Sequence, residues 1–156
     1  LVIDGLKLRL PLFKEMEEKL AYSQFSRTLS TLVEGGIPLM DGLRVTVDSL
    51  ENKEMNRRFE KIIPAIESGD SFSKALKAVS CVPKAMVKIV HVGEESGELG
   101  KMLFSLSEQY EEDVSTITST LTAMIEPVLF LLVAGTIGAL LVALLLPVLS
   151  AASNIR

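Results

Sequence analysis

The sequence predicts an all-α protein, an antiparallel six-helix bundle whose last long helix continues into one transmembrane helix. Before residue 127, apolar residues recur every three or four positions, as on one face of a helix, and no run alternates as a strand would. After residue 127 the pattern changes, because Val128–Val148 reads VLFLLVAGTIGALLVALLLPV and holds fourteen Leu, Ile, Val or Phe residues. Twenty helical residues span about 30 Å, the thickness of the hydrocarbon layer of a bilayer.

Charge is confined to the part before this apolar segment. All twenty acidic residues precede Pro127, and of the sixteen basic residues only Arg156 follows it. The net charge is −4, and we interpret the basic residues as scattered among acids, which gives no reason to expect a nucleic acid partner. The single cysteine, Cys81, can form no disulfide within the chain.

The chain begins with a lead-in segment followed by the first helix. We expect residues 1–13 to be extended, because Asp4-Gly5 favours a turn and Pro11 disfavours helix before it. From Lys14 to about Glu34 apolar residues recur with the helical period. Gly36, the second of two glycines, then stops this helix.

Prolines and capping residues set the bounds of the next two helices. Pro38 opens the second helix, which runs to about Leu50. Asn52 can cap the third helix, Pro64 should bend it, and Gly69 ends it.

The fourth and fifth helices are short. Ser71 can cap the fourth helix, FSKALKAV, and Pro83 starts the fifth, which runs to about Val92. Gly93 and Gly97 then let the chain leave one helix and enter the next, and glutamates beside them favour the positive N-terminus of that helix. We therefore predict a bend here.

The sixth helix has the clearest periodicity. Its apolar residues form one stripe, Leu99, Leu103, Leu106, Tyr110, Val114, Ile117, Leu121 and Met124. Only Glu126-Pro127 separates this stripe from the apolar segment, so we expect one long helix, kinked there, that joins the bundle to the bilayer. The predicted organisation is a lead-in (1–13), a bundle domain (14–123), a transmembrane helix (124–149) and a short tail (150–156).

The segment HVGEESGELGKML, residues 91–103, has the glycines and charges of a phosphate-binding loop without the spacing. No Ser or Thr follows Lys101, and the glutamates would repel a phosphate. His91 with Glu94 or Glu95 provides too few ligands for a transition metal, and the pair Cys81 and His91 lacks a third group. We expect no catalytic residue, no cofactor and no enzymatic activity.

Two charged helix faces remain as candidate binding sites. The acidic face Glu108, Glu111, Glu112 and Asp113 has the oxygen ligands of a hard cation, with Glu108, Glu112 and Asp113 as the candidate metal ligands. We favour a solvated face, because the glycine-containing loop of a calcium site is absent. The basic face Lys53, Arg57, Arg58 and Lys61 is a candidate site for an acidic protein partner or lipid head groups, or it only solubilises the helix.

Four segments together carry a resemblance to a known family. FSRTLSTLVEGGIPLMDGL, SGDSFSKAL, VGEESGELGKMLFSLSEQYEED and EPVLFLLVAGTIGALLVALLLPV resemble the type II secretion system F family, inner-membrane platform proteins of type II secretion and type IV pilus machines. The resemblance covers nearly the whole chain, which looks like the C-terminal half of such a protein. The structural motif residues are Gly36, Gly69, Gly93, Glu94, Gly97, Leu99, Pro127 and Pro147.

The resemblance implies a non-enzymatic scaffold that couples a cytoplasmic hexameric assembly ATPase to pilus or pseudopilus assembly and protein secretion. Its implied partners are that ATPase, pilin or pseudopilin subunits, other inner-membrane assembly proteins, membrane lipid and further copies of the chain. It places the bundle in the cytoplasm and the span in the bacterial inner membrane, whereas Arg156 alone slightly favours a cytoplasmic tail. The alternatives are a membrane-anchored transporter component, which needs polar residues lining several spans, and a membrane-anchored enzyme, which needs a catalytic constellation.

Overall fold

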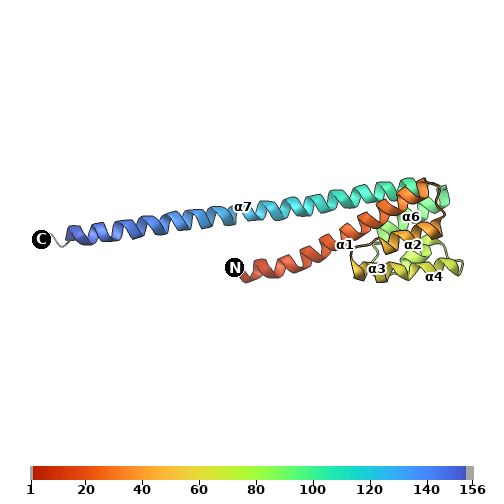
Figure 1. Ribbon diagram of the computed structural model, residues 1–156, viewed down its shortest axis with the longest axis horizontal. Coiled ribbons are helices and arrows are strands. Elements are labelled where there is room, and N and C mark those ends of the chain that lie inside the picture. Colours follow the sequence, from red (N-terminus) through yellow and green to blue (C-terminus); the bar gives the residue numbers. More distant parts are fainter. Residues whose placement is uncertain (1, 154–156) are drawn as a thin grey trace. The chain divides into compact units, whose positions relative to one another are not determined.

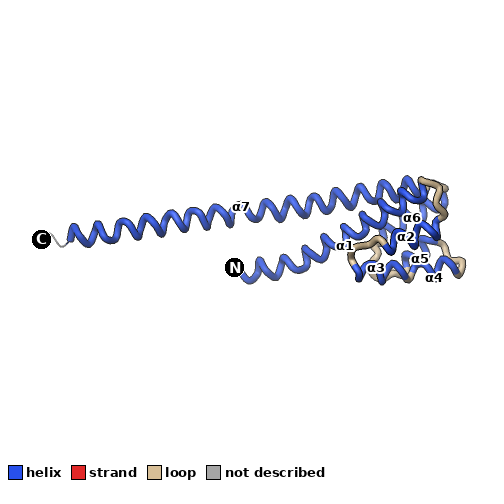
Figure 2. Tube along the Cα trace, in the orientation of Figure 1, coloured by secondary structure: helices blue, strands red, loops and turns tan. Residues whose placement is uncertain are grey.

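The computed structural model describes residues 2–153 of the chain and the side chains of residues 13–151. This part is helical and contains no strand (Figures 1 and 2). Its elements are α1 (Val2–Glu34), α2 (Leu39–Asp48), α3 (Lys53–Glu60), α4 (Ile62–Glu67), α5 (Phe72–Lys77), α6 (Lys84–Ser96) and α7 (Leu99–Ser153). The chain forms two compact units, one ending at Ser115 and the other beginning at Thr116.

The all-α prediction is confirmed, and the one extra element is the third expected helix divided in two. The structure ends α3 at Glu60 and starts α4 at Ile62. Pro64 explains the position of this break, since a proline lacks the N–H that would bond to the carbonyl of Glu60, and its ring crowds that carbonyl. The bend predicted at Pro64 is therefore present as a break before it.

The start of the chain differs from the expectation. The structure makes α1 helical from Val2, so an extended lead-in is wrong for residues 2–13. Leucine, lysine and arginine dominate this segment and are good helix formers, and the restriction that Pro11 places on Leu10 is a preference that a helix can override. Residue 1 lies outside the described residues. The separation of the lead-in from the bundle as domains stays a prediction.

The predicted helix caps are confirmed at both capping side chains. The Asn52 side-chain oxygen accepts hydrogen bonds from the backbone N–H groups of Glu54 and Met55, at 3.0 and 3.1 Å. Ser71 Oγ accepts from the N–H of Lys74 at 3.3 Å. Each cap satisfies donors that have no partner within their own helix.

Glycine ends two of the helices in the way the sequence indicates. Gly36 and Gly69 have φ values of +83° and +99°, in the left-handed region that other residues rarely adopt. They follow the last turns of α1 and α4, so the chain reverses there without steric strain.

The core of the first unit is built around three fully buried phenylalanines from three helices. Phe25 of α1 stacks on Phe59 of α3, with ring centroids 4.2 Å apart and planes 24° apart. Phe72 of α5 lies 6.4 Å from Phe25, measured between ring centroids. Rings at such distances gain about 0.5–1.5 kcal/mol beyond their area burial, so this cluster fixes the short helices on α1.

Small residues bring α1 and the start of α7 close together within the first unit. Ser30 Oγ donates a buried hydrogen bond to the carbonyl of Gly100 at 2.8 Å. A Cβ added to Gly100 would lie only 2.1 Å from Oε1 of Glu34. Leu103, Leu106 and Tyr110 of the predicted stripe are buried, so the first part of the stripe packs into the bundle as expected, whereas Met124 at its end is exposed.

The second unit is the continuation of α7 from Thr116 to Ser153. The helix runs through Pro127 and Pro147 without a break in its assignment, and a kink at Pro127 stays a prediction. From Met124 onward its large apolar side chains are exposed, from 45% at Ile125 to 74% at Leu131. Its most apolar 18-residue window has a mean hydropathy of 2.8 and no buried residue, so this helix is long and apolar enough to cross a membrane.

Candidate functional site

In the segment His91–Leu103, Glu94 joins two neighbouring helices, a contact that was not predicted from the sequence. The carboxylate of Glu94 accepts hydrogen bonds from the backbone N–H groups of Phe72 and Ser73, at 2.6 and 3.0 Å. These N–H groups are the first donors of α5, which have no partner within that helix. Glu94 therefore fastens α6 to α5 and also places a negative charge at the positive end of a helix.

The prediction that both glycines bend the chain is correct for Gly97 and wrong for Gly93. Gly97 has a φ of +71° and ends α6, which runs four residues beyond the expected end at Val92. Gly93 lies buried inside α6. A Cβ there would lie 3.0 Å from Cα of Leu99 and 3.2 Å from Cβ of Met102, so Gly93 allows α7 to pack closely against α6.

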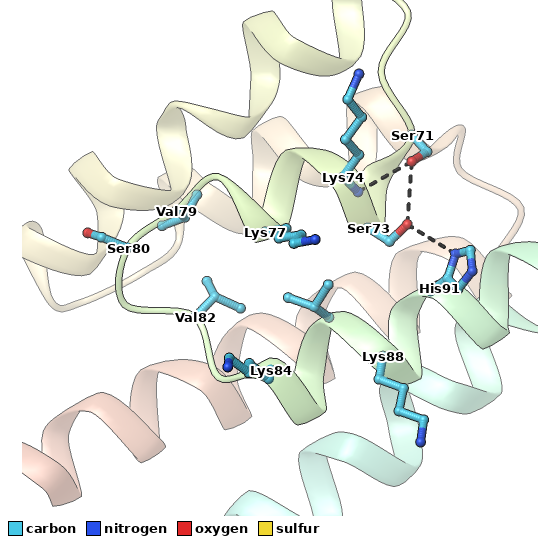
Figure 3. Close-up of a pocket in the computed structure, with 11 residues that line it drawn as sticks. Ser71, Ser73, Lys74, Lys77, Val79, Ser80, Val82, Lys84, Lys88 and His91 are labelled. Atoms are coloured by element: carbon cyan, nitrogen blue, oxygen red, sulfur yellow. Dashed lines mark hydrogen bonds between the residues drawn. The ribbon is translucent and has the colours of Figure 1, made fainter.

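The first unit carries a basic groove between α5 and α6. It has a volume of about 860 Å³ (Figure 3). Its polar lining consists of lysines, serines and the histidine, namely Lys74, Lys77, Lys84, Lys88, Ser71, Ser73, Ser80 and His91. Its apolar lining is Val79, Val82 and Val87. We call this hollow the lysine groove.

The lysine groove was not predicted from the sequence, although a signal for it was present. Residues 71–93 contain four lysines and a histidine and no acidic residue, in a chain of net charge −4. The interpretation that basic residues are scattered among acids therefore fails for this segment. The lysines lie on two helices with a turn between them, so their grouping cannot be recognised from the periodicity of a single helix.

Most of the groove's positive charge is not neutralised within the described part of the chain. Lys74 forms an ion pair with Asp70 one turn earlier. Lys77, Lys84 and Lys88 are exposed and have no carboxylate partner among the described residues. An uncompensated cluster of three lysines attracts anionic groups, an effect that rises as ionic strength falls.

The predicted basic face on α3 is only partly assembled. Arg57 and Lys61 line a smaller hollow of about 470 Å³, together with Arg44 of α2. Lys53 is exposed on the same helix. Arg58 pairs with Glu54 and lines a different, smaller hollow, and its pKa is raised by interaction with the side chain of Cys81 first and then with Glu54. Its role as a partner-binding residue stays a prediction.

The acidic residues of α7 bind the basic residues of α1 in the first unit. Asp113 accepts a hydrogen bond from Lys19 at 2.9 Å, and this contact raises the pKa of the lysine. Glu111 accepts from Arg27 at 2.8 Å, and the same guanidinium lies 4.8 Å above the ring of Phe104. Exposed pairs of this kind contribute about 0.2–1 kcal/mol each.

The remaining chemical candidates do not come together. Among the described residues, no three His, Cys, Asp or Glu side chains are grouped as metal ligands, so the candidates Glu108, Glu112 and Asp113 do not form such a group. Cys81 and His91 both lie in the described part of the chain and share no hydrogen bond. The backbone carbonyl of Cys81 instead accepts one from the Tyr22 hydroxyl, at 2.5 Å.

Comparison with known proteins gives one consistent result. Residues 25–147 match the profile of the family described as Type II secretion system (T2SS), protein F. The chain is 31% identical over 153 residues to a type IV pilus assembly protein PilC of Myxococcus xanthus, which covers 98% of this chain and 37% of that protein. It is 33% identical over 147 residues to a protein of the same name from Thermus thermophilus, covering 94% of this chain and 36% of that protein.

A relative that is named for type II secretion matches over a similar stretch. A type II secretion system protein F of Pseudomonas aeruginosa is 27% identical over 146 residues, covering 94% of this chain and 36% of that protein. The chain thus spans a little over a third of the length of the curated relatives that it matches.

Proposed function

We propose that this chain, which belongs to the type II secretion system protein F family, is a non-enzymatic platform in the assembly of a pilus or pseudopilus. The relatives are named for type IV pilus assembly and for type II secretion. Under this proposal the apolar part of α7 crosses the bacterial inner membrane, and the bundle of the first unit lies in the cytoplasm.

The observation that carries the proposal is the unbroken α7. Its first turns hold buried side chains of the bundle core, and its later turns expose apolar side chains on all sides. A continuous helix transmits displacement better than a flexible linker, because each residue is held by hydrogen bonds to its neighbouring turns. We propose that α7 carries movement of the bundle to the span.

The partners follow from this role. In the cytoplasm the bundle meets a hexameric assembly ATPase, and in the membrane the span meets lipid, pilin or pseudopilin subunits and other assembly proteins. Further copies of the chain complete the platform. Lys53 and Arg57 of α3, with Lys61 directly after it, offer exposed positive charge to an acidic partner.

The orientation can be tested with cysteines and a membrane-impermeant maleimide. In a Cys81→Ser background, single substitutions Lys53→Cys and Ser150→Cys report the two sides of the membrane. We expect Lys53→Cys to react only after the inner membrane is opened, and Ser150→Cys to react in cells whose outer membrane alone is permeabilised. The reverse pattern would contradict a cytoplasmic bundle.

The role can be tested by deletion and crosslinking. We expect loss of the gene to abolish surface pili or secretion, and a photo-crosslinker at Arg57 to capture the assembly ATPase or another machine component. Normal pili and secretion in the deletion strain would overturn the proposal. Ion flux through reconstituted protein would favour the transporter alternative.

A further inference from the structure

The lysine groove has no assigned role in the platform described above. Its floor is formed by valines, with Val79 buried and Val82 and Val87 half-buried. Figure 3 shows Lys77 reaching over the middle of the groove, while Lys74 and Lys88 extend outward on opposite sides. The groove therefore offers an apolar strip between positively charged rims.

The donors of the groove are lysine side chains and not backbone groups. A phosphate site usually uses free N–H groups at a helix N-terminus. At α5 these groups are already occupied by Ser71 Oγ and the carboxylate of Glu94. The groove lining also includes no arginine for bidentate phosphate contacts and no Phe, Tyr or Trp ring for stacking a base. A nucleotide is thus a poor match to this surface.

The spacing of the lysines matches a helical protein segment. Lys84 and Lys88 are four residues apart on α6, so they lie one turn apart on the same face. Two carboxylates one turn apart on a partner helix have the same separation, roughly 5–6 Å between Cβ atoms. Lys77 on α5 can meet a third carboxylate, and small aliphatic side chains of the same segment can cover the valines.

We propose that the lysine groove between α5 and α6 docks an acidic, amphipathic segment of a partner protein. The observations that point to it are the unpaired charges of Lys77, Lys84 and Lys88, the valine floor and the occupied N–H groups of α5. The inference rests on the proposed function only in that the partner is sought among components of the same machine. It assigns binding to a second surface, separate from the basic face of α3.

Zero-length carbodiimide crosslinking tests the contact directly, because this reagent joins a lysine amine to a carboxylate that touches it. Membranes carrying the full-length protein and its machine are treated and digested, and the isopeptide links are identified by mass spectrometry. We expect links from Lys77, Lys84 or Lys88 to Asp or Glu residues within one segment of another protein. The absence of any such link would overturn the proposal.

Charge reversal supplies the matched comparison. Lys84→Glu/Lys88→Glu should lower the yield of links from Lys77 roughly tenfold, since like charges at an interface repel strongly. Lys14→Glu/Lys101→Glu changes the net charge equally at exposed lysines outside both basic surfaces and should leave that yield unchanged. Equal losses in both variants would mean a general charge effect and would overturn the proposal. If the reversal disturbs folding, Lys84→Gln/Lys88→Gln removes the charge and replaces it with a neutral side chain.

A charge exchange completes the test. Changing the linked carboxylates of the partner to lysine, in the Lys84→Glu/Lys88→Glu background, should restore pilus assembly or secretion, and no rescue would contradict a direct contact. If calorimetric titration with inorganic pyrophosphate at constant ionic strength shows saturable binding that Lys84→Gln/Lys88→Gln abolishes, the groove is a phosphate site and the proposal falls. If the groove variant assembles pili or secretes normally while the deletion strain does not, the groove proposal fails and the platform function stands.

Discussion

The two parts of α7 contain the same types of apolar residue, but these are buried in the first part and exposed in the second. From Leu99 to Tyr110 one stripe of apolar side chains is buried or half-buried in the bundle, whereas mostly polar residues and the partly exposed Phe104 occupy the other faces. From Val128 to Val148 apolar side chains face every direction, and the most apolar window has no buried residue. The arrangement of leucines around the helix, rather than their number, therefore decides whether a helix seeks a protein core or a lipid phase.

This difference predicts that truncating a leucine to alanine lowers the stability of the bundle in the first part of α7 but not in the second. Leu103→Ala should lower the free energy of unfolding of the bundle by about 2–5 kcal/mol, because Leu103 is fully buried and a cavity remains. Leu140→Ala, at a side chain that is 65% exposed, should leave bundle unfolding unchanged. Urea titration of the full chain in detergent, followed by near-ultraviolet circular dichroism, measures both. Equal effects of the two variants would contradict separate roles for the two parts.

Introducing a charged residue should weaken membrane insertion only in the apolar part of α7. Leu140→Arg places a charge near the middle of the span, where insertion becomes less favourable by about 2.5–3.5 kcal/mol. Glu108→Arg changes an exposed position on the polar side of the first part, and the protein should remain fully in the membrane. Resistance to alkaline extraction from membranes measures both variants. Full retention of the Leu140→Arg protein in the membrane would contradict a transmembrane position for this part of α7.

Replacing glycine by alanine should have a smaller effect, which differs between Gly93 of α6, packed against the first part of α7, and Gly138 in the apolar part. Gly93→Ala introduces a Cβ within 3.0 Å of Leu99 Cα, and it should destabilise the bundle by about 1–3 kcal/mol. Gly138→Ala meets no atom within 4 Å in this chain and should not alter bundle unfolding. A loss of self-association in the Gly138→Ala protein, seen by crosslinking in membranes, would locate a contact between spans at this glycine.

The sequence was sufficient to predict the elements whose causes are local. Pro38, Asn52, Ser71 and Pro83 set helix starts, and the helices begin directly after each of them. These signals act through the backbone of neighbouring residues, so no tertiary information is needed.

The features that the sequence did not predict depend on contacts between distant residues. Gly93 looks like a bend because a glycine permits one, but its actual role depends on Leu99 packing against it. Glu94 looks like a favourable charge near the next helix, whereas it caps a preceding helix 22 residues away in the chain. The lysine groove needs two helices side by side, so only the acid-free composition of residues 71–93 could have indicated it.

The smallest predicted effect concerns pH, and it should arise only in the first part of α7, because Val128–Val148 holds no titratable group. Burial and then the charge of Asp113 raise the pKa of Tyr110 to about 12 from 10.0. Because the folded pKa is the higher one, the stability from the protonated phenol is complete below pH 10 and is lost as pH rises toward 12. At about pH 11 the loss should be about 1 kcal/mol. Tyr110→Phe keeps the ring and removes the titration, so urea unfolding of this variant should depend less on pH in that range. An unchanged dependence would mean that other groups, such as Tyr22, whose pKa is also raised by burial, control alkaline unfolding.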